Sequence, residues 1–255
     1  MPELIQVEQL EPGIVSVLMS RPDRRNALCI KLLDQLCAAI EKLAGSPAHR
    51  VAILRGAGPI FSAGLDLREA GDGSLVEQSA AAVSRALDLL RTTPLVMIAA
   101  VQGGAFAGGA GLMAACDIVI AADDAKIGFP EARRGLLPAL ICEVLLHRVR
   151  EGDLRELLLA GDPIDASRAR KVGLVQRVVP AERLLDEAIG VARSVVAGGP
   201  NAIRQTKALL GVMFQRTSDH HSPDLVATHL AARQSDEARE GLAAFAEKRE
   251  PNWEL

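Results

Sequence analysis

GGAFAGGAGLMAACD, residues 103–117, is the stretch that decides the fold of this chain. Its small residues let a ligand approach bare backbone amides, and the apolar run after Gly108 and Gly109 predicts a buried helix through Met113. The first N–H groups of a helix have no internal partner and carry partial positive charge. Glu131 follows downstream in apolar surroundings. This pattern predicts a site where amides polarise a carbonyl and one carboxylate moves a proton.

Phosphate-binding glycine loops do not fit this segment. The dinucleotide pattern GxGxxG begun at Gly109 needs glycine at Ala114, and its short-chain variant GxxxGxG fails at Ala110. A P-loop would need lysine at Ala110. The alternatives that remain are exposed backbone amides and close helix-to-strand packing through small residues.

Composition indicates a globular chain. It has 255 residues, of which 49% are apolar and 24% charged, enough for one large domain or two small ones. The net charge of −3 does not indicate a nucleic-acid partner, which would favour a basic surface. Five Phe, one Trp and no Tyr leave no aromatic platform for stacked bases.

The cysteines and the chain start indicate a reducing compartment. The four cysteines lie in apolar segments without CxxC spacing, as small buried hydrophobes do. Residues 1–11 lack a basic start followed by an apolar run, and no run of 18 apolar residues occurs. We therefore expect a cytoplasmic protein with no membrane partner.

Strand and helix signals alternate in the first half, which predicts the α/β class. Strands are expected at 13–19, 51–54, 95–101 and 117–121, and helices at 27–43 and 80–91. Beyond Pro138, helices are expected at 139–149, 151–160, 166–172, 181–197, 201–214 and 223–248. The break at Gly198-Gly199-Pro200 suggests a core over 1–197 and a helical region over 198–255 that packs on the core or on a neighbouring subunit.

Several motifs in register resemble the crotonase family, the enoyl-CoA hydratase/isomerase superfamily. They are RPDRRNAL (21–28), FSAGLDL (61–67), the glycine segment, FPEARRGLLP (129–138) and FAEKREPNW (245–253). The resemblance covers nearly the whole chain. It implies a crotonase-like spiral of ββα units with a C-terminal helical extension, an acyl-CoA ligand, and a homotrimer or a hexamer.

The resemblance also assigns catalytic roles. In the family two peptide N–H groups hold the thioester oxygen, and here these belong to Leu65 and Gly108. A catalytic glutamate falls at Glu131, whose apolar neighbours favour a raised pKa. The alternative for Glu131 is a structural salt bridge to Arg133 or Arg134.

Coenzyme A contacts are implied for two loops and the glycine segment. They comprise Arg24, Arg25, Ala27, Ala63, Gly64, Leu65, Asp66, Leu67, Arg68 and Gly108. The arginines suit the phosphates, although a solvated charge run is the alternative. Asp66 has the alternative role of a helix cap. No separate cofactor or metal is expected, because the CoA thioester is the substrate. His220 and His221 lie among Ser, Asp and Pro, which indicates a polar loop.

The second glutamate of family hydratases is missing. Its position falls at Gly111, which we expect to widen the pocket for a branched acyl group. One carboxylate suffices to add water to an α,β-unsaturated acyl-CoA, and Gly111-Leu112 with residues 136–139 is similar to methylglutaconyl-CoA-type hydratases. We therefore expect a lyase of fatty acid metabolism. The alternatives are a Δ3-Δ2 enoyl-CoA isomerase and a non-catalytic acyl-CoA-binding protein.

Overall fold

The computed structural model describes residues 3–215 and 225–249. Two sheets form the centre of this part of the chain. The larger has the strand order β1 (Ile5–Glu11), β2 (Ile14–Met19), β3 (Val51–Gly56), β4 (Val96–Val101), β6 (Ile118–Ala122) and β9 (Arg177–Val179). The smaller has the order β5 (Gly104–Phe106), β7 (Lys126–Gly128) and β8 (Ile164–Asp165).

Helices surround both sheets. The α-helices are α1 (Ile30–Ala44), α2 (Leu67–Ala70), α3 (Val76–Thr92), α4 (Gly108–Ala115), α5 (Ala139–Leu146), α6 (Glu151–Ala160), α7 (Ala166–Lys171), α8 (Leu184–Val196), α9 (Pro200–Gln215), α10 (Leu225–Arg233) and α11 (Asp236–Glu247). Short 3-10 turns are η1 (Pro22–Arg24), η2 (Ala132–Arg134) and η3 (Ala181–Arg183).

The chain winds as a spiral in which each turn visits both sheets. β4 leads directly into β5, and β6 leads into β7, so each of these two turns adds one strand to each sheet before a helix returns the chain. Strands β2, β3, β4, β6 and β9 run parallel in the larger sheet, while β1 is antiparallel to β2. This confirms the predicted α/β class with ββα units.

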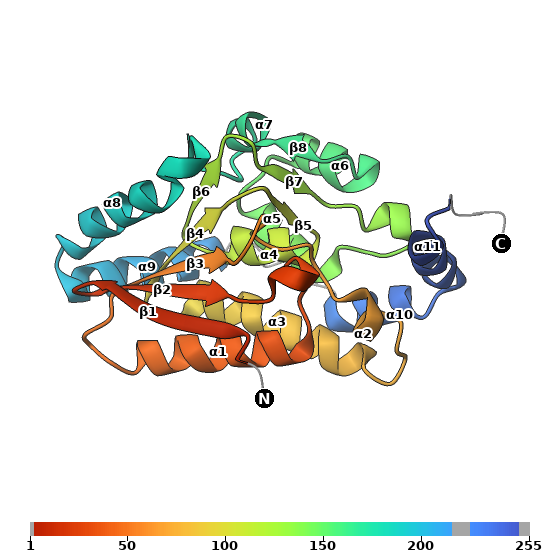
Figure 1. Ribbon diagram of the computed structural model, residues 1–255, viewed down its shortest axis with the longest axis horizontal. Helices are drawn as coiled ribbons and strands as arrows, with labels where there is room; N and C mark the ends of the chain where they lie inside the picture. Colours follow the sequence, from red (N-terminus) through yellow and green to blue (C-terminus); the bar gives the residue numbers. More distant parts are fainter. Residues whose placement is uncertain (1–2, 216–224, 250–255) are drawn as a thin grey trace.

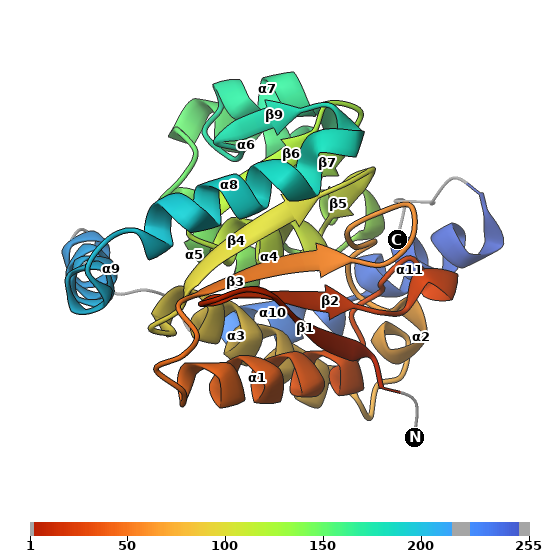
Figure 2. The same ribbon diagram turned by 60° about the vertical axis from the view of Figure 1, so that its left-hand side comes forward.

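The apolar faces of the helices close the core. α1 and α3 lie side by side below the larger sheet in Figure 1, and Figure 2 shows α8 running across its strands. α4 lies between α3 and α5, and every one of its residues is buried. A helix that is apolar all round needs such complete cover.

Most predicted elements are confirmed, with differences at their ends. α1 begins at Ile30 and not at 27, because Leu28 instead forms a bridge to Leu65 in an extended conformation. The helix expected over 223–248 is two helices, α10 and α11, with the Ser235 side chain accepting the N–H of Ala238 as the cap of the second. Strands β1, β5, β7, β8 and β9 were not predicted, and all except β1 have only two or three residues.

The helices after residue 197 take separate positions. α9 lies at one end of the molecule, and its side chains leave a large apolar area exposed. The exposed residues are Leu209, Leu210, Val212, Met213 and Phe214. α10 packs on α3 and α5, and α11 packs on η2. The boundary at 197 and the trimer or hexamer stay predictions. His220, His221 and the end of the 245–253 motif lie outside the described residues.

Within the part of the chain that the structure describes, no helix combines the length and the apolar character that crossing a membrane requires.

Candidate active site

Two loops are tied together beside the start of α4. The N–H of Leu28 donates to the Gly64 carbonyl over 2.7 Å, and the Phe106 N–H donates to the Ser62 carbonyl over 3.0 Å. Residues 62–65 therefore run as an added strand between Leu28 and β5. Gly64 has φ +90, and a Cβ there would lie 2.7 Å from the Phe106 carbonyl oxygen, so only glycine fits this approach.

Two amides beside this approach are unpaired. Among the hydrogen bonds of the described residues, neither the Leu65 N–H nor the Gly108 N–H has an acceptor. The two residues are neighbours, since a Cβ on Gly108 would lie 3.9 Å from Leu65 Cδ2. Ala107 precedes Gly108 with φ 49 and ψ −126, a conformation that L residues rarely adopt. Residues in such strained conformations cluster at functional sites.

Glu131 stands between β7 and η2. Its main-chain oxygen accepts the N–H groups of Arg134 (2.9 Å) and Leu136 (3.0 Å), which fixes the turn. The residue is 9% exposed, and its Oε2 atom has no hydrogen-bond partner. Burial raises the pKa of Glu131 to about 7, although the positive charge of Arg134 opposes part of this rise.

The expected alternative, a salt bridge from Glu131 to an arginine, is wrong. Arg133 pairs with Asp162 over 2.5 Å. The guanidinium of Arg134 instead stacks over the Phe245 ring, 4.2 Å from its centroid. The carboxyl of Glu131 therefore has no ion-pair partner among the described residues.

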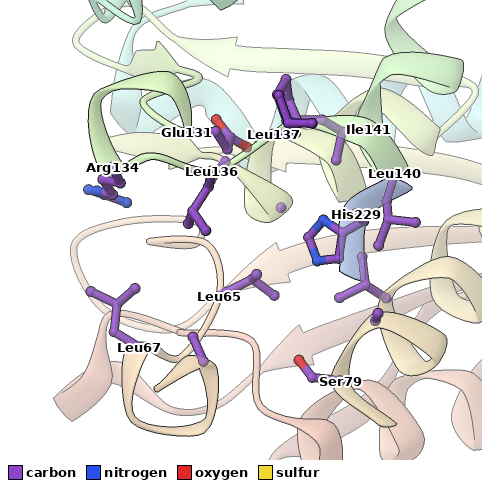
Figure 3. A pocket seen from close by; sticks show the side chains of 16 residues that line it. Leu65, Leu67, Ser79, Glu131, Arg134, Leu136, Leu137, Leu140, Ile141 and His229 are labelled. Carbon is purple, nitrogen blue, oxygen red and sulfur yellow. The ribbon is translucent and has the colours of Figure 1, made fainter. Parts of the chain in front are cut away.

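Leu65, Gly108 and Glu131 line one pocket of about 650 Å³, its open mouth included. Figure 3 shows the Glu131 carboxyl, the Leu65 side chain and the His229 ring around the same space. Its other lining residues are mainly apolar and come from α2, α3, α5 and the turn before α5: Leu67, Ala70, Ala80, Val83, Leu136, Leu137, Pro138, Leu140 and Ile141. Such walls strengthen each polar contact made inside.

Comparison with known proteins agrees with this arrangement. Residues 9–255 match the enoyl-CoA hydratase/isomerase family. The enoyl-CoA hydratase EchA19 of Mycobacterium tuberculosis is 35% identical over 246 residues, which cover 93% of this chain and 92% of that protein. The chain belongs to the enoyl-CoA hydratase/isomerase family. It is therefore an enzyme of acyl-CoA metabolism, as its sequence predicts.

Solved structures of the family share the whole fold. An enoyl-CoA hydratase from Mycobacterium avium aligns with a TM-score of 0.85 at 30% identity, over 99% of this chain and 100% of that one. Methylmalonyl-CoA decarboxylase in complex with 2-nitronate-propionyl-CoA aligns with a TM-score of 0.86 at 25% identity, over 98% of each chain. The family fold thus carries more than one reaction.

The residues expected to contact coenzyme A lie in the two tied loops. Arg24, Arg25 and Arg68 are exposed, whereas Ala27, Ala63, Leu65 and Leu67 are partly buried, and Gly64, Asp66 and Gly108 are buried. Asp66 takes the alternative role of a helix cap: its side chain accepts the Arg68 N–H over 3.1 Å at the start of α2. It also pairs with Arg21 over 2.6 Å, a contact that the sequence did not predict.

Asn26 is a second residue whose role was missed. It is fully buried, and its side-chain amide donates to the carbonyls of Ala57 (2.8 Å) and Ile60 (2.9 Å). Its φ of 50 is left-handed, which asparagine tolerates better than most residues. The sequence feature that could have indicated this role is the asparagine inside the 21–28 motif. Asn26 joins the first loop to the segment that leads into the second.

Gly111 does not widen the pocket, contrary to expectation. A Cβ on Gly111 would lie 3.2 Å from Ile141 Cβ and closer still to Ile141 Cγ2, with Leu87 Cδ2 at 3.6 Å. Ile141 therefore fills the space of the missing glutamate and itself lines the pocket. Among the described lining residues, Glu131 is the only carboxylate.

Gly111→Ala should destabilise the protein by about 1–3 kcal/mol, because the added methyl overpacks the α4–α5 contact. The matched change Gly190→Ala lies in α8, where nothing approaches within 4 Å, and should instead stabilise by about 0.5–1 kcal/mol. Urea unfolding of both variants measures these effects. The packing explanation fails if Gly111→Ala is neutral, or if adding Ile141→Ala does not relieve its cost.

Glu131→Gln should stabilise the fold at pH 8 and leave it unchanged near pH 4.5. The pKa of Glu131 rises from 4.5 to about 7 on folding, so stability is complete below pH 4.5 and falls as pH rises through 7. The gain at pH 8 is on the order of 3 kcal/mol. Urea unfolding at the two pH values checks it, with the exposed Glu8→Gln as control. Equal gains at both pH values would contradict the burial argument.

Proposed function

We propose that this enzyme adds water to an α,β-unsaturated acyl-CoA. The observation that carries the proposal is the pair of unpaired amides, Leu65 and Gly108, in one apolar pocket with the single carboxylate Glu131. Water addition places negative charge on the thioester oxygen, and two fixed N–H donors in a dry pocket stabilise that charge. The N-terminus of α4 adds its partial positive charge.

Glu131 moves one proton twice in this scheme. Its carboxylate removes a proton from water while the water oxygen bonds to the β-carbon, and the electron pair of the double bond passes to the thioester oxygen. The protonated Glu131 then returns the proton to the α-carbon as the enolate collapses. A pKa of about 7 suits both steps, because the group must accept and release a proton near neutral pH.

The two tied loops carry the coenzyme A end of the substrate in this proposal. Backbone groups of residues 63–67 border the entrance beside Ala27, and Arg24, Arg25 and Arg68 supply exposed guanidinium groups for the phosphates. Arg21 is committed to Asp66 and keeps the loops in register.

The second candidate is a Δ3-Δ2 enoyl-CoA isomerase. A lone carboxylate favours it, since one group can carry a proton between carbons two positions apart without water. The same amides would hold the same enolate oxygen. The non-catalytic alternative, an acyl-CoA-binding protein, leaves the raised pKa of Glu131 without a use.

Product mass separates these functions. The enzyme is incubated with a 2-enoyl-CoA and with a 3-enoyl-CoA, and we expect the first to gain the mass of one water. Glu131→Gln should abolish this gain, and Gly108→Pro should slow it about 10²- to 10³-fold by removing one donor. Leu65→Ala keeps its N–H and should change the rate little.

The kcat/KM of the wild-type enzyme should rise with pH through about 7 and then level off, because Glu131 must be ionised to act as the base.

Unchanged mass with a shifted double bond would establish the isomerase instead. Bound acyl-CoA with no product from either substrate would favour the binding protein. Circular dichroism of Gly108→Pro controls for folding, since proline is accommodated at the first position of a helix.

A further inference from the structure

The pocket ends in a polar group that the proposed chemistry does not use. His229 projects from α10 into the pocket lined by Leu65 and Glu131 (Figure 3). The residue is only 7% exposed, and neither Nδ1 nor Nε2 has a hydrogen-bond partner. Burial and the nearby charge of Arg233 lower the pKa of His229 to about 4, although the adjacent main chain of Leu137 opposes part of this, so the ring is neutral at pH 7. A buried imidazole without partners is costly unless a ligand supplies them.

Arg233 follows one helical turn after His229. It is 6% exposed, and its Nη2 donates to the carbonyl of Ala70, a residue that lines the pocket. Its Nη1 has no partner, and none of the described residues forms an ion pair with it. Burial alone lowers the pKa of Arg233, and no neighbouring acid opposes this. The wall between α2 and α10 therefore holds a buried cation without a counter-ion.

The other charges of the pocket do not supply that counter-ion. Glu131 is the one acid among the described lining residues, and the charge that acts on it is that of Arg134. Figure 3 shows Arg134 on the side of the pocket away from His229. A buried charge that lacks a partner destabilises a fold. A ligand that brings an anion to His229 and Arg233 would remove this cost.

We propose that His229 and Arg233 bind a carboxylate carried by the acyl group of the substrate. The N–H of the neutral His229 ring donates to one carboxylate oxygen, and Arg233 supplies the positive charge and the free Nη1 donor beside it. The preferred ligands are thus CoA thioesters of dicarboxylic acids. The inference rests on the proposed function in taking an acyl-CoA as the ligand, and it makes His229 and Arg233 residues of specificity rather than of catalysis.

Matched saturated acyl-CoAs test this without any turnover. Calorimetry compares chains of four to eight carbons, each supplied once with a terminal methyl and once with a terminal carboxylate. In the wild-type enzyme the carboxylate member of at least one length should bind about 10- to 100-fold more tightly, as charged hydrogen bonds allow. Arg233→Met and His229→Phe should each lower this ratio at least several-fold, while affinity for the methyl members stays or increases.

Two further variants keep the test valid. Arg233→Lys retains the charge and should retain most of the preference, so it answers the question if Arg233→Met fails to fold. Arg204→Met changes an exposed arginine on α9 and should leave the ratio unchanged. The inference is overturned if the wild-type enzyme binds the methyl members as tightly as the carboxylate members at every length, or if the ratio survives both Arg233→Met and His229→Phe.

The outcome separates this inference from the proposed function. If the enzyme hydrates a 2-enoyl-CoA but shows no preference for acyl groups with a terminal carboxylate, the proposed function is supported and the inference is wrong. A preference that depends on Arg233, together with no reaction of any enoyl-CoA, would do the reverse. If none of these acyl-CoAs binds at all, both are wrong.

Discussion

The site depends on one short piece of added strand. Residues 62–65 are hydrogen-bonded on one side to Leu28 and on the other to β5, and this holds Leu65 beside Gly108. Neither N–H group has an acceptor among the described residues, because Gly108 is the first residue of α4 and Leu65 makes no ladder bond through its N–H. The arrangement tolerates no side chain at Gly64. The Ser62 hydroxyl donates to the main-chain carbonyl of Asn26, whose side-chain amide holds Ala57 and Ile60 in the segment before it. A carbonyl oxygen placed between these amides would find two fixed donors without rearrangement of the protein.

Burial in this pocket raises the pKa of Glu131 and also lowers the stability of the fold. The apolar walls that raise the pKa of Glu131 also leave Glu131 Oε2, both nitrogens of His229 and Arg233 Nη1 without partners. These groups belong to two separate segments of the chain, the loop that precedes η2 and helix α10. A folded protein that kept such groups only for structure would gain by pairing them. Glu131 and His229 line the same pocket, and Arg233 contacts its lining residue Ala70; unpaired buried groups of this kind cluster at functional sites.

The sequence predicted what depends on local pattern. Periodicity located the long helices and strands. The glycine segment with Glu131 indicated exposed amides and an acid, and the family resemblance assigned the amides to Leu65 and Gly108; all three residues line one pocket. Strands such as β7 and β8 are too short to show a period and form only because their partners exist. The Arg21–Asp66 pair and the role of Asn26 depend on contacts across loops. The expectation that Gly111 widens the pocket was wrong for a related reason. A missing side chain leaves space only if no neighbour fills it, and here Ile141 of α5 fills it.

The polarisation of the thioester carbonyl by the Leu65 and Gly108 amides is the central claim, and the vibrational frequency of that carbonyl measures it directly. Difference infrared spectra of a bound 2-enoyl-CoA, with ¹³C at the thioester carbon to identify the band, should show the carbonyl stretch moved to lower frequency than in water. The displacement should shrink in Gly108→Pro and persist in Leu65→Ala, because only the first change removes an N–H donor. A carbonyl band at its solution frequency in the wild-type complex would contradict the account.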